Sequence, residues 1–479
     1  MQVEEAAANQ EVSMTTVAAP REEYYTGRAV MLASVAALGG FLFGFDTAVI
    51  NGAVTAIRDQ FSTSPFMTGF MVSSALLGCV VGAWMAGRMA DRYGRIKVMM
   101  LASALFTISA IGSGLAIGPW DLIVWRIVGG LAVGAASVIA PAYIAEISPA
   151  SIRGRLGSLQ QLAIVIGIFA ALLTDAALAA AAGSASAELF LGLEAWRWMF
   201  LSEIIPAVAY GLLALRIPES PRYLVAKGQT EKAKASLGQI LKSGVDERIA
   251  EIGRSLRGEK RSSLKDLRGR MLGLLPIVWV GILLSVFQQF VGINVIFYYS
   301  TALWQQVGFS ESEALTTSVI TSIINIVVTL IAISLIDKFG RRPLLLTGSA
   351  GMMVSLGTLA VVFGSAPVVD DSPVLGPIAG PVALIAANLF VMFFGVSWGP
   401  VVWVLLGEMF NNRLRAAALG LAAAAQWLSN FLISTTFPTL AETSLALAYG
   451  LYTAFAVLSF FFVLKLVPET KNKQLEEMA

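Results

Sequence analysis

The chain has 479 residues, of which 57% are hydrophobic and only 13% are charged, and its mean hydropathy is +0.75. Since soluble domains carry about 25% charged residues, most of this chain's surface must be hidden from water, and lipid is the simplest cover. The net charge of +2 gives a nucleic-acid partner no electrostatic support, so we expect none.

Cys79 is the only cysteine, and the chain has no histidine. A disulfide within the chain and a cysteine cluster for a metal are therefore excluded, and the commonest metal ligand and general base are missing. We expect no metal and no cofactor. An enzyme is disfavoured as well, because most connections are too short to house a catalytic site.

The chain begins with a polar segment, 1–28, that lacks the basic start and small-residue cleavage site of a signal peptide. Apolar runs of about 20 residues follow it, each long enough to cross a bilayer as a helix. There are twelve of them: 29–51, 67–86, 98–117, 121–145, 158–181, 197–216, 272–300, 316–336, 343–364, 380–405, 416–440 and 444–466.

Positive charge is confined to alternate connections between these runs. The connections near 87–97, 153–155, 217–271, 338–342 and 413–415 hold clusters of Lys and Arg, whereas the connections between them hold only Arg58. Because positive loops stay in the cytoplasm, we expect both termini there, which requires an even number of spans. The alanine-rich composition and short loops favour a bacterial inner (plasma) membrane.

Motifs at the basic connections recur after about 250 residues. Residues 87–95 (GRMADRYGR) match 337–342 (DKFGRR), and 218–220 (PES) match 468–470 (PET). We expect an all-α membrane protein with twelve transmembrane helices in two pseudo-symmetric six-helix bundles. The expected parts are a cytoplasmic tail (1–28), an N-terminal bundle (29–216), cytoplasmic linker helices (217–271), a C-terminal bundle (272–466) and a second cytoplasmic tail (467–479).

Acidic residues accompany the basic ones in these repeated motifs, although topology alone does not require them. Two similar halves around a central site are typical of secondary transporters, and charge clusters at helix ends suit a latch that holds the halves together in one state. The candidate latch residues are Arg88, Asp91, Arg92, Glu146, Arg153, Glu219, Arg222, Asp337, Arg341, Glu408 and Arg415. For single Lys and Arg residues, a solvated loop charge is the simpler interpretation.

The motifs resemble the sugar porter branch of the major facilitator superfamily over nearly the whole chain, including its bacterial proton-coupled symporters and its facilitative glucose transporters. The matching signatures are 87–95 (GRMADRYGR), 196–200 (WRWMF), 218–222 (PESPR), 288–294 (QQFVGIN) and 468–471 (PETK). The resemblance implies two helical bundles that work by alternating access.

Ionisable side chains inside apolar spans are costly and indicate a function, and Asp46, Arg126 and Glu203 stand out among them. Counted from the expected span ends, all three lie at one depth in one half, which suggests a contact. Burial favours the neutral form of a carboxyl group, whereas a neighbouring guanidinium favours its anion. A carboxyl group under both influences can gain and lose a proton. We expect Asp46 to couple protons to transport, with Arg126 as partner and Glu203 as modulator; the alternative is a permanent ion pair.

Uncharged amides form a second polar set within the spans. Amides donate and accept hydrogen bonds at once, as sugar hydroxyls require, and tryptophan can cover the apolar face of a sugar ring. The alternative for single amides is helix–helix bonding. Family resemblance implies sugar contacts at Gln161, Gln288, Gln289, Asn294, Asn325, Gly399, Trp403, Gln426 and Trp427, and flanking or gating roles for Phe43, Tyr298 and Phe394.

Residues 288, 289 and 294 do not share one face of a regular helix. Gly292, between them, could let the helix unwind so that all three point inward, and 395–400 (GVSWGP) predicts a second break.

We expect symport of a proton with a neutral monosaccharide by a protein that acts as a monomer in the lipid bilayer. Ile168 lies two turns after Gln161, at a position that in the family this chain resembles tends to be apolar in hexose carriers and can be polar in pentose-type sites. The resemblance therefore favours a hexose such as glucose or galactose. The alternatives are a facilitative uniporter and a pentose (xylose or arabinose) symporter. A sugar sensor is disfavoured, because only nine residues follow Thr470.

Overall fold

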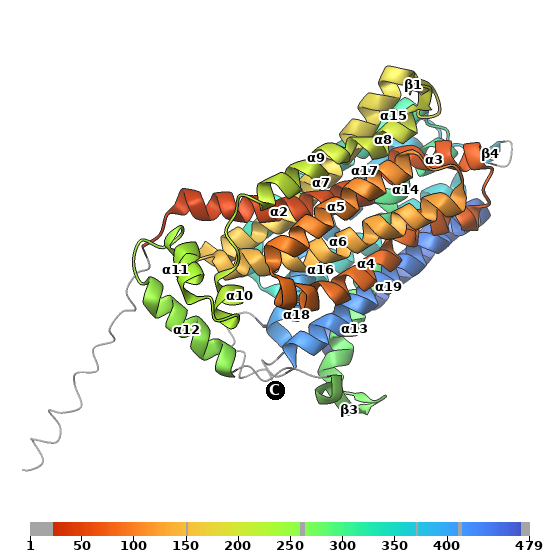
Figure 1. Ribbon diagram of the computed structural model, residues 1–479. Coiled ribbons are helices and arrows are strands. Elements are labelled where there is room, and N and C mark those ends of the chain that lie inside the picture. The colour runs from red at the N-terminus through yellow and green to blue at the C-terminus, as the bar shows by residue number, and fades with distance from the viewer. Residues whose placement is uncertain (1–22, 150–151, 259–263, 370–371, 411–413, 471–479) are drawn as a thin grey trace, which may run out of the picture.

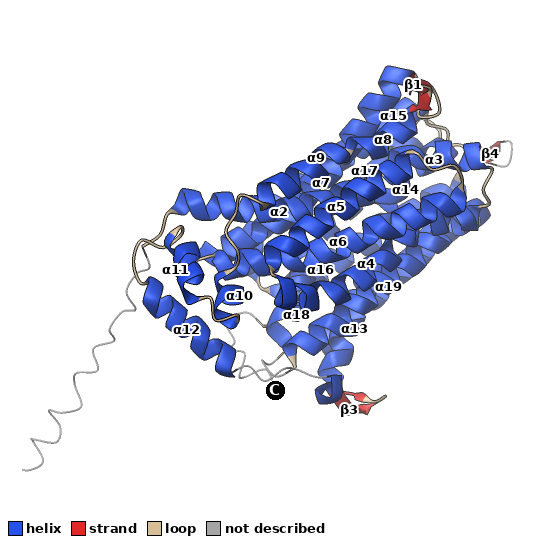
Figure 2. Ribbon diagram, viewed as in Figure 1, coloured by secondary structure: helices blue, strands red, loops and turns tan. Residues whose placement is uncertain are grey.

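The structure is a computed structural model that describes residues 23–149, 152–258, 264–369, 372–410 and 414–470. Within these ranges, twelve helical stretches are long and apolar enough to cross a membrane, as expected from the sequence. Helices make up nearly all of the ordered structure, and the few short strands lie at the ends of the helical bundle (Figure 2).

The first half of the chain supplies six of the spans. Two spans are divided, one into α2 and α3 and the other into α8 and α9. The helices of this half are α2 (Thr26–Ala48), α3 (Ile50–Phe61), α4 (Pro65–Tyr93), α5 (Arg95–Gly114), α6 (Pro119–Ile147), α7 (Arg153–Ala182), α8 (Ala195–Ser202) and α9 (Ile204–Ala214). A hairpin of β1 (Glu188–Phe190) and β2 (Leu193–Glu194) joins α7 to α8.

The second half repeats this plan after a linker with α10 (Pro221–Ala226), α11 (Thr230–Gly238), α12 (Val245–Gly258), the 3₁₀ turn η2 (Leu264–Leu267) and β3 (Arg268–Met271). Its spans are α13 (Pro276–Phe290) with α14 (Ile293–Gln306), α15 (Glu311–Phe339), α16 (Arg341–Ser365), α17 (Ala379–Val396) with α18 (Trp398–Met409), α19 (Arg415–Thr443) and α20 (Leu445–Leu466). Strands β4 (Val368–Val369) and β5 (Ser372–Pro373) pair between α16 and α17.

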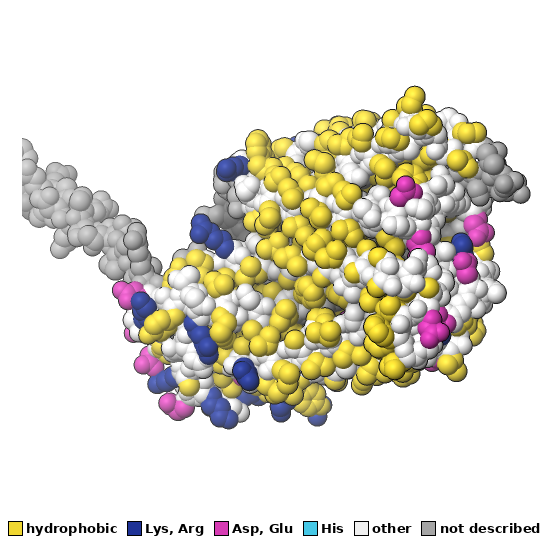
Figure 3. Space-filling model, turned by 90° about the horizontal axis from the view of Figure 1, so that it is seen from above, with side chains coloured by type: hydrophobic (Ala, Val, Ile, Leu, Met, Phe, Trp, Pro, Cys, Tyr) yellow, Lys and Arg dark blue, Asp and Glu magenta, His cyan; other side chains and the backbone are white. Residues whose placement is uncertain are grey.

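The two ends of the bundle differ in charge. Helices α10, α11 and α12 lie at one end, away from α3 and the β1–β2 hairpin (Figure 1). Lys and Arg gather at the α10–α12 end, where some Asp and Glu lie among them, whereas the charged side chains at the opposite end are mainly Asp and Glu (Figure 3). We call these the basic end and the distal end.

The helices of each half pack closely on one another. In the first half α4 packs on α6 and α2 packs on α7, and in the second half α16 packs on α20 and α13 packs on α19. The α2–α7 contact brings backbones together, because a Cβ added to Gly44 would collide with the Ile164 carbonyl, and one added to Gly167 would collide with that of Phe41. Small residues allow this close approach between membrane helices.

The expected span boundaries were wrong at several ends. The first span runs from Thr26 to Phe61 rather than over 29–51, because α3 continues through the charged residues Arg58 and Asp59, where the apolar pattern stops. The seventh span is Pro276–Gln306 rather than 272–300, and the tenth, Ala379–Met409, reaches four residues beyond its expected end.

Hydrogen bonds join the two halves at the distal end. The Asn51 amide on α3 donates to the Phe297 carbonyl at 3.0 Å and to Ser300 Oγ at 2.8 Å, and its oxygen accepts from Thr301 N–H at 3.0 Å. The Ser73 and Thr435 hydroxyls bond across the α4–α19 contact at 2.6 Å. In this conformation the halves are therefore closed against each other at the distal end.

Candidate functional site

A buried ion pair lies in the first half, where the sequence predicts a contact. Arg126 Nη1 on α6 donates to the Asp46 carbonyl at 2.9 Å and to Asp46 Oδ1 at 3.3 Å, and both side chains are 2% exposed. Gly129 leaves room for the pair, since a Cβ there would lie 2.8 Å from Asp46 Oδ1. The carboxylate of α2 is thus held by one guanidinium, away from bulk water.

Glu203 lies at the junction of α8 and α9 and is buried as well. It interacts electrostatically with both Asp46 and Arg126. Within the described residues, Asp46 Oδ2, Arg126 Nε and Glu203 Oε1 are buried with no hydrogen-bond partner. Among these residues the guanidinium is therefore bonded to Asp46 alone, and the cluster has unused bonding capacity, unlike a fully satisfied structural ion pair.

The amides of the second half form a chain. Asn294 Nδ2 donates to Gln289 Oε1 at 2.6 Å, Gln289 Nε2 donates to Gln288 Oε1 at 3.3 Å, and Gln288 Nε2 donates to the Trp398 and Gly399 carbonyls at 2.8 and 3.3 Å. All of these groups are neutral, and they join α13, α14 and α18.

Two helix breaks make this chain possible, and both were expected from the sequence. Gly292 has φ = 83°, in the left-handed region, and separates α13 from α14. Ser397 separates α17 from α18, and the Trp398 and Gly399 carbonyls in the first turn of α18 accept from Gln288. Irregular backbone at mid-span is tolerated where it lines a cavity or a buried site, as in transporters.

Aromatic side chains close the space between the halves. The rings of Phe43 on α2 and Trp427 on α19 lie 5.7 Å apart between centroids. Tyr298 is buried on α14, and its hydroxyl accepts from Asn430 at 3.4 Å. Tyr298 also lies within electrostatic range of Asp46 and Arg126, so the ion pair of one half borders the amide-bearing helix of the other.

Among the described residues, no hydrogen bond joins the remaining candidates for substrate contact to the amide chain. Asn325 on α15 faces Gly395, and Phe394 packs beside Gly399. Gln161 is partly buried on α7, and Gln426 Oε1 is buried and has no hydrogen-bond partner in the ranges that the structure describes. Trp403 is 43% exposed, and the described residues offer it no hydrogen bond or ring contact. The contacts that the structure shows thus join Gln288, Gln289, Asn294 and Gly399, with Phe43 and Trp427 as a separate pair.

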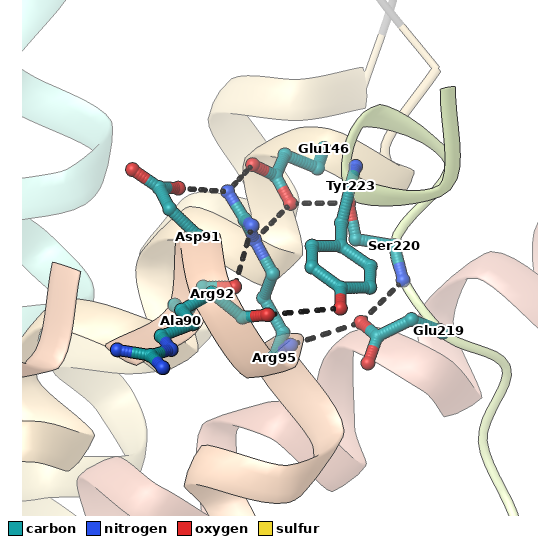
Figure 4. A network of polar contacts seen from close by, with 8 residues as sticks. All are labelled: Ala90, Asp91, Arg92, Arg95, Glu146, Glu219, Ser220 and Tyr223. Carbon is teal, nitrogen blue, oxygen red and sulfur yellow. Dashed lines mark hydrogen bonds and ion pairs between the residues drawn. The ribbon is translucent and has the colours of Figure 1, made fainter. Parts of the chain in front are cut away.

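A polar network occupies the basic end of the first half (Figure 4). The Arg95 guanidinium makes two hydrogen bonds to Glu146, at 2.8 and 3.0 Å, and also contacts Asp91 at 3.4 Å. Ser220 Oγ donates to the same Glu146 carboxylate. The carboxylate of Glu219 accepts from the N–H groups of Arg95 and Ile96 at 3.0 and 3.2 Å, which caps the first turn of α5.

The second half repeats this network. Arg341 makes two hydrogen bonds to Glu408, at 2.7 and 3.0 Å, and Thr470 Oγ1 donates to Glu408 at 2.6 Å. Glu469 accepts from the N–H groups of Arg341 and Arg342 at 3.1 and 3.0 Å and caps α16. The sequence repeat is thus a structural repeat.

Only some of the candidate latch residues belong to these two networks. In this conformation the Glu146 and Glu408 pairs join helices of one half, so a latch between the halves stays a prediction. Arg88 lies 4.2 Å above the Trp84 ring, Arg92 lies over Tyr93, Arg153 donates to the Ser148 carbonyl, and Arg222 donates to Ser255. The side chains of Asp337 and Arg415 lie outside the described part of the chain.

Sequence reasoning missed several members of these networks. Arg95, Glu469 and Thr470 belong to the repeated motifs, and their match to Arg341, Glu219 and Ser220 was the available signal. Asp175 is a carboxylate within an apolar run, a signal that was overlooked. Asn51 was expected to be the last residue of the first span. A polar residue is ordinary at a span end, so nothing in the sequence indicated that Asn51 contacts the other half.

The family model for "Sugar (and other) transporter" matches residues 32–479. The chain is 59% identical over 451 residues to the glucose transport protein of Synechocystis sp., a match that covers 94% of this chain and 96% of that protein. It is 37% identical over 491 residues to the D-xylose-proton symporter of Escherichia coli, covering 95% and 96%. It is 37% identical over 454 residues to the arabinose-proton symporter of Bacillus subtilis, covering 94% of each chain.

Solved structures share the fold. The chain matches the partially occluded inward open conformation of the xylose transporter XylE from E. coli with a TM-score of 0.79 and 35% identity, over 94% of this chain and all of that one. The inward open conformation of the same protein gives a TM-score of 0.78, with 36% identity over 93% and 98% of the two chains.

Proposed function

Since the chain belongs to the sugar transporter family of the major facilitator superfamily, we propose that it is a proton-coupled symporter of a neutral monosaccharide. The observation that carries the proposal is the combination of a buried Asp46–Arg126 pair in the first half with a neutral amide chain in the second. One site suits a proton and the other suits an uncharged, hydroxyl-bearing substrate. The family and fold are those of a transporter rather than of an enzyme.

The ion pair supports proton coupling through its incomplete bonding. When Asp46 takes a proton, its charge attraction to Arg126 is lost, and the guanidinium can turn to Glu203. The pair can therefore exist in two arrangements that differ by one proton, and each can favour one orientation of the halves. Tyr298, within electrostatic range of the pair and bonded to Asn430, links this change to the second half.

The amide chain supports sugar binding. Gln288, Gln289 and Asn294 each retain donor or acceptor positions that the internal chain does not use. The Phe43–Trp427 pair supplies an aromatic surface across the halves, which a sugar ring could face. No charged side chain takes part in these contacts, which favours a neutral ligand over an ion.

We propose a hexose such as glucose or galactose as the substrate. Ile168 on α7 is apolar and partly buried, and the glucose transport protein of Synechocystis is the more similar of the named relatives. A pentose is the second candidate, because the xylose and arabinose symporters are also similar over the whole chain.

The protein is a multi-pass membrane protein, and we propose that its basic end and both termini face the cytoplasm. The distal end, where Asn51 joins the halves, then faces outward. The structure would represent the state that is closed to the outside. This agrees with its similarity to inward open conformations of XylE.

Transport in proteoliposomes tests the proposal. Sugar entry should alkalinise the outer solution, and an inward proton gradient should drive sugar uptake against its own gradient. Asp46→Asn should abolish uphill uptake while sugar exchange across the membrane continues. Asp59→Asn is the matched control, because it is the same substitution in the same span at a side chain that is 62% exposed.

A facilitative uniporter is the competing function. It would equilibrate sugar without moving the external pH, and Asp46→Asn would leave its net uptake intact. Competition of labelled glucose uptake by unlabelled galactose, xylose and arabinose then identifies the preferred sugar in either case.

A further inference from the structure

A third buried carboxyl, after those of Asp46 and Glu203, lies near the distal contact between the halves. Asp175 on α7 is 0% exposed and belongs neither to the Asp46 cluster nor to the amide chain. Its Oδ2 accepts from the Gly52 N–H on α3 at 3.2 Å, and its Oδ1 has no hydrogen-bond partner among the described residues. A buried carboxylate is stable when several donors or a cation satisfy it, and Asp175 has a single weak donor.

In the described part of the chain, no charged side chain forms a hydrogen bond or an ion pair with Asp175. The elements packed against α7 are α2, α3, α6, α8, α15 and β1. The ionisable residues that they carry, with Glu203 at the end of α8, are Arg28, Asp46, Arg58, Asp59, Asp121, Arg126, Tyr143, Glu146, Glu188, Arg197, Glu203, Glu311, Glu313, Asp337 and Lys338. Among those whose side chains are described, none acts electrostatically on Asp175.

The partner of Asp175 is the backbone of a helix that forms the distal closure. A Cβ on Gly52 would lie 2.6 Å from Asp175 Cβ, so α7 rests directly on the α3 backbone. Gly52 follows Asn51, whose amide holds Phe297, Ser300 and Thr301 of α14. A movement that separates α14 from α3 therefore breaks the hydrogen bonds of Asn51. The next residue in the chain is Gly52, whose backbone N–H donates to Asp175.

The position of Gly52 makes the carboxyl sensitive to such a movement. Gly52 lies in the first turn of α3, where backbone N–H groups lack partners within the helix and favour a negative charge. Burial opposes that charge while the halves are closed. Water that enters when α14 moves away would solvate the carboxylate and remove the cost of burying its charge. Opening of the distal end therefore favours the ionised form of Asp175, and closure favours the neutral acid.

We propose that Asp175 is a second proton-binding site, which holds a proton while the distal end is closed and releases it to the distal solution when that end opens. On opening, the carboxyl O–H bond breaks, the proton passes to water, and the carboxylate keeps the Gly52 N–H as donor. On closure, a proton from the same solution restores the acid. External acid therefore favours closure through Asp175, separately from the proton carried by Asp46. This inference rests on the proposed symport function.

Distance measurements between spin labels test the proposal. Asp59→Cys on α3 and Ser312→Cys at the distal start of α15 place one label on each half, in a Cys79→Ser background. Electron–electron resonance in lipid nanodiscs then gives the ratio of distal-open to distal-closed molecules as a function of pH. The measurement is made with Asp46→Asn and Glu203→Gln present, so that neither carboxyl of the first proton site can respond.

With Asp175 intact, the open-to-closed ratio should rise with pH, by up to about tenfold per pH unit for one proton. Adding Asp175→Asn should abolish this rise and leave the closed form dominant at every pH. An unchanged rise in the Asp175→Asn protein, or no rise with Asp175 present, would overturn the proposal. Asp175→Ser, which also cannot ionise, replaces the asparagine variant if that variant does not purify as a folded protein.

The outcome is separable from that of the symport proposal. Sugar-induced alkalinisation by the unsubstituted protein tests symport and involves no label. If sugar entry alkalinises the outer solution but the open-to-closed ratio depends on pH in the same way with and without Asp175, only the second proton site is refuted. If alkalinisation fails, the symport function is refuted whatever the labels show.

Discussion

Arg95 and Arg341, 246 residues apart in the chain, make the same contacts at equivalent places in the two halves. Each begins a helix after a glycine with positive φ, each makes two hydrogen bonds to a glutamate on the same half, and each has its N–H capped by a second glutamate. The networks tie the α4–α5 and α15–α16 connections to the core of their own half. They stabilise the two rigid bodies that alternating access needs.

Glu146→Gln tests this stabilising role. The side chains of Arg95 and Glu146 are 10% and 12% exposed, so the substitution leaves a largely buried guanidinium without its anion. We expect a loss of about 2 kcal/mol in stability, seen as a lower midpoint when purified protein is heated and assayed by size-exclusion chromatography. Asp91→Asn is the control, because Asp91 contacts the same Arg95 but is 73% exposed. Equal midpoints for the two variants would contradict the assignment.

Gly292→Ala should impair sugar binding through the helix break. The φ of 83° is strained for any residue with a Cβ, by about 1 kcal/mol, and the added Cβ would lie 2.7 Å from the Tyr452 ring. The break should shift, and Asn294 should lose its contact with Gln289. We expect a raised KM in sugar counterflow. Gly450→Ala, in open space within a helix, should leave counterflow at the parent level.

Gln288→Ala tests the amide chain directly. Gln288 joins the chain to the Trp398 and Gly399 carbonyls, so its removal takes away a sugar-bonding group and leaves Gln289 without its acceptor. A loss of about 1–3 kcal/mol corresponds to roughly 5- to 150-fold weaker sugar binding, measured by isothermal titration calorimetry. Gln229→Ala, at an exposed turn, controls for the loss of an amide. Unchanged affinity in Gln288→Ala would remove Gln288 from the binding site.

Much of the site could be predicted because polar residues in apolar spans are conspicuous. The count of spans and the breaks at Gly292 and near Ser397 followed from composition and from residues with special backbone preferences. The contact of Asp46 with Arg126 was expected from depth, although the outer end of the first span was misplaced by ten residues. The predicted contact was confirmed despite this error in the span limits. The information about the contact therefore came from the charged residues themselves.

Other features depend on how helices rotate against each other, which the sequence does not state. Arg88 and Arg95 both lie in the motif at 87–95, yet only Arg95 is directed at Glu146, because Arg88 lies on the face that carries Trp84. Asn51 is a single amide at an expected span end, and only the α3–α14 contact reveals it as a tie between the halves.

Asn51→Ala should therefore shift the balance between states of the transporter. The Asn51 side chain makes three hydrogen bonds to α14, and it can make them only while the distal end is closed. Their loss, at about 1 kcal/mol each at most, should raise the open-to-closed ratio, measured with the same spin-label pair at Asp59 and Ser312. Asn388→Ala is the matched control, because the Asn388 amide bonds only within the second half, to Thr321 and the Leu384 carbonyl. A ratio that rises equally in both variants would mean that general loosening of the bundle, and not the tie between α3 and α14, sets the balance.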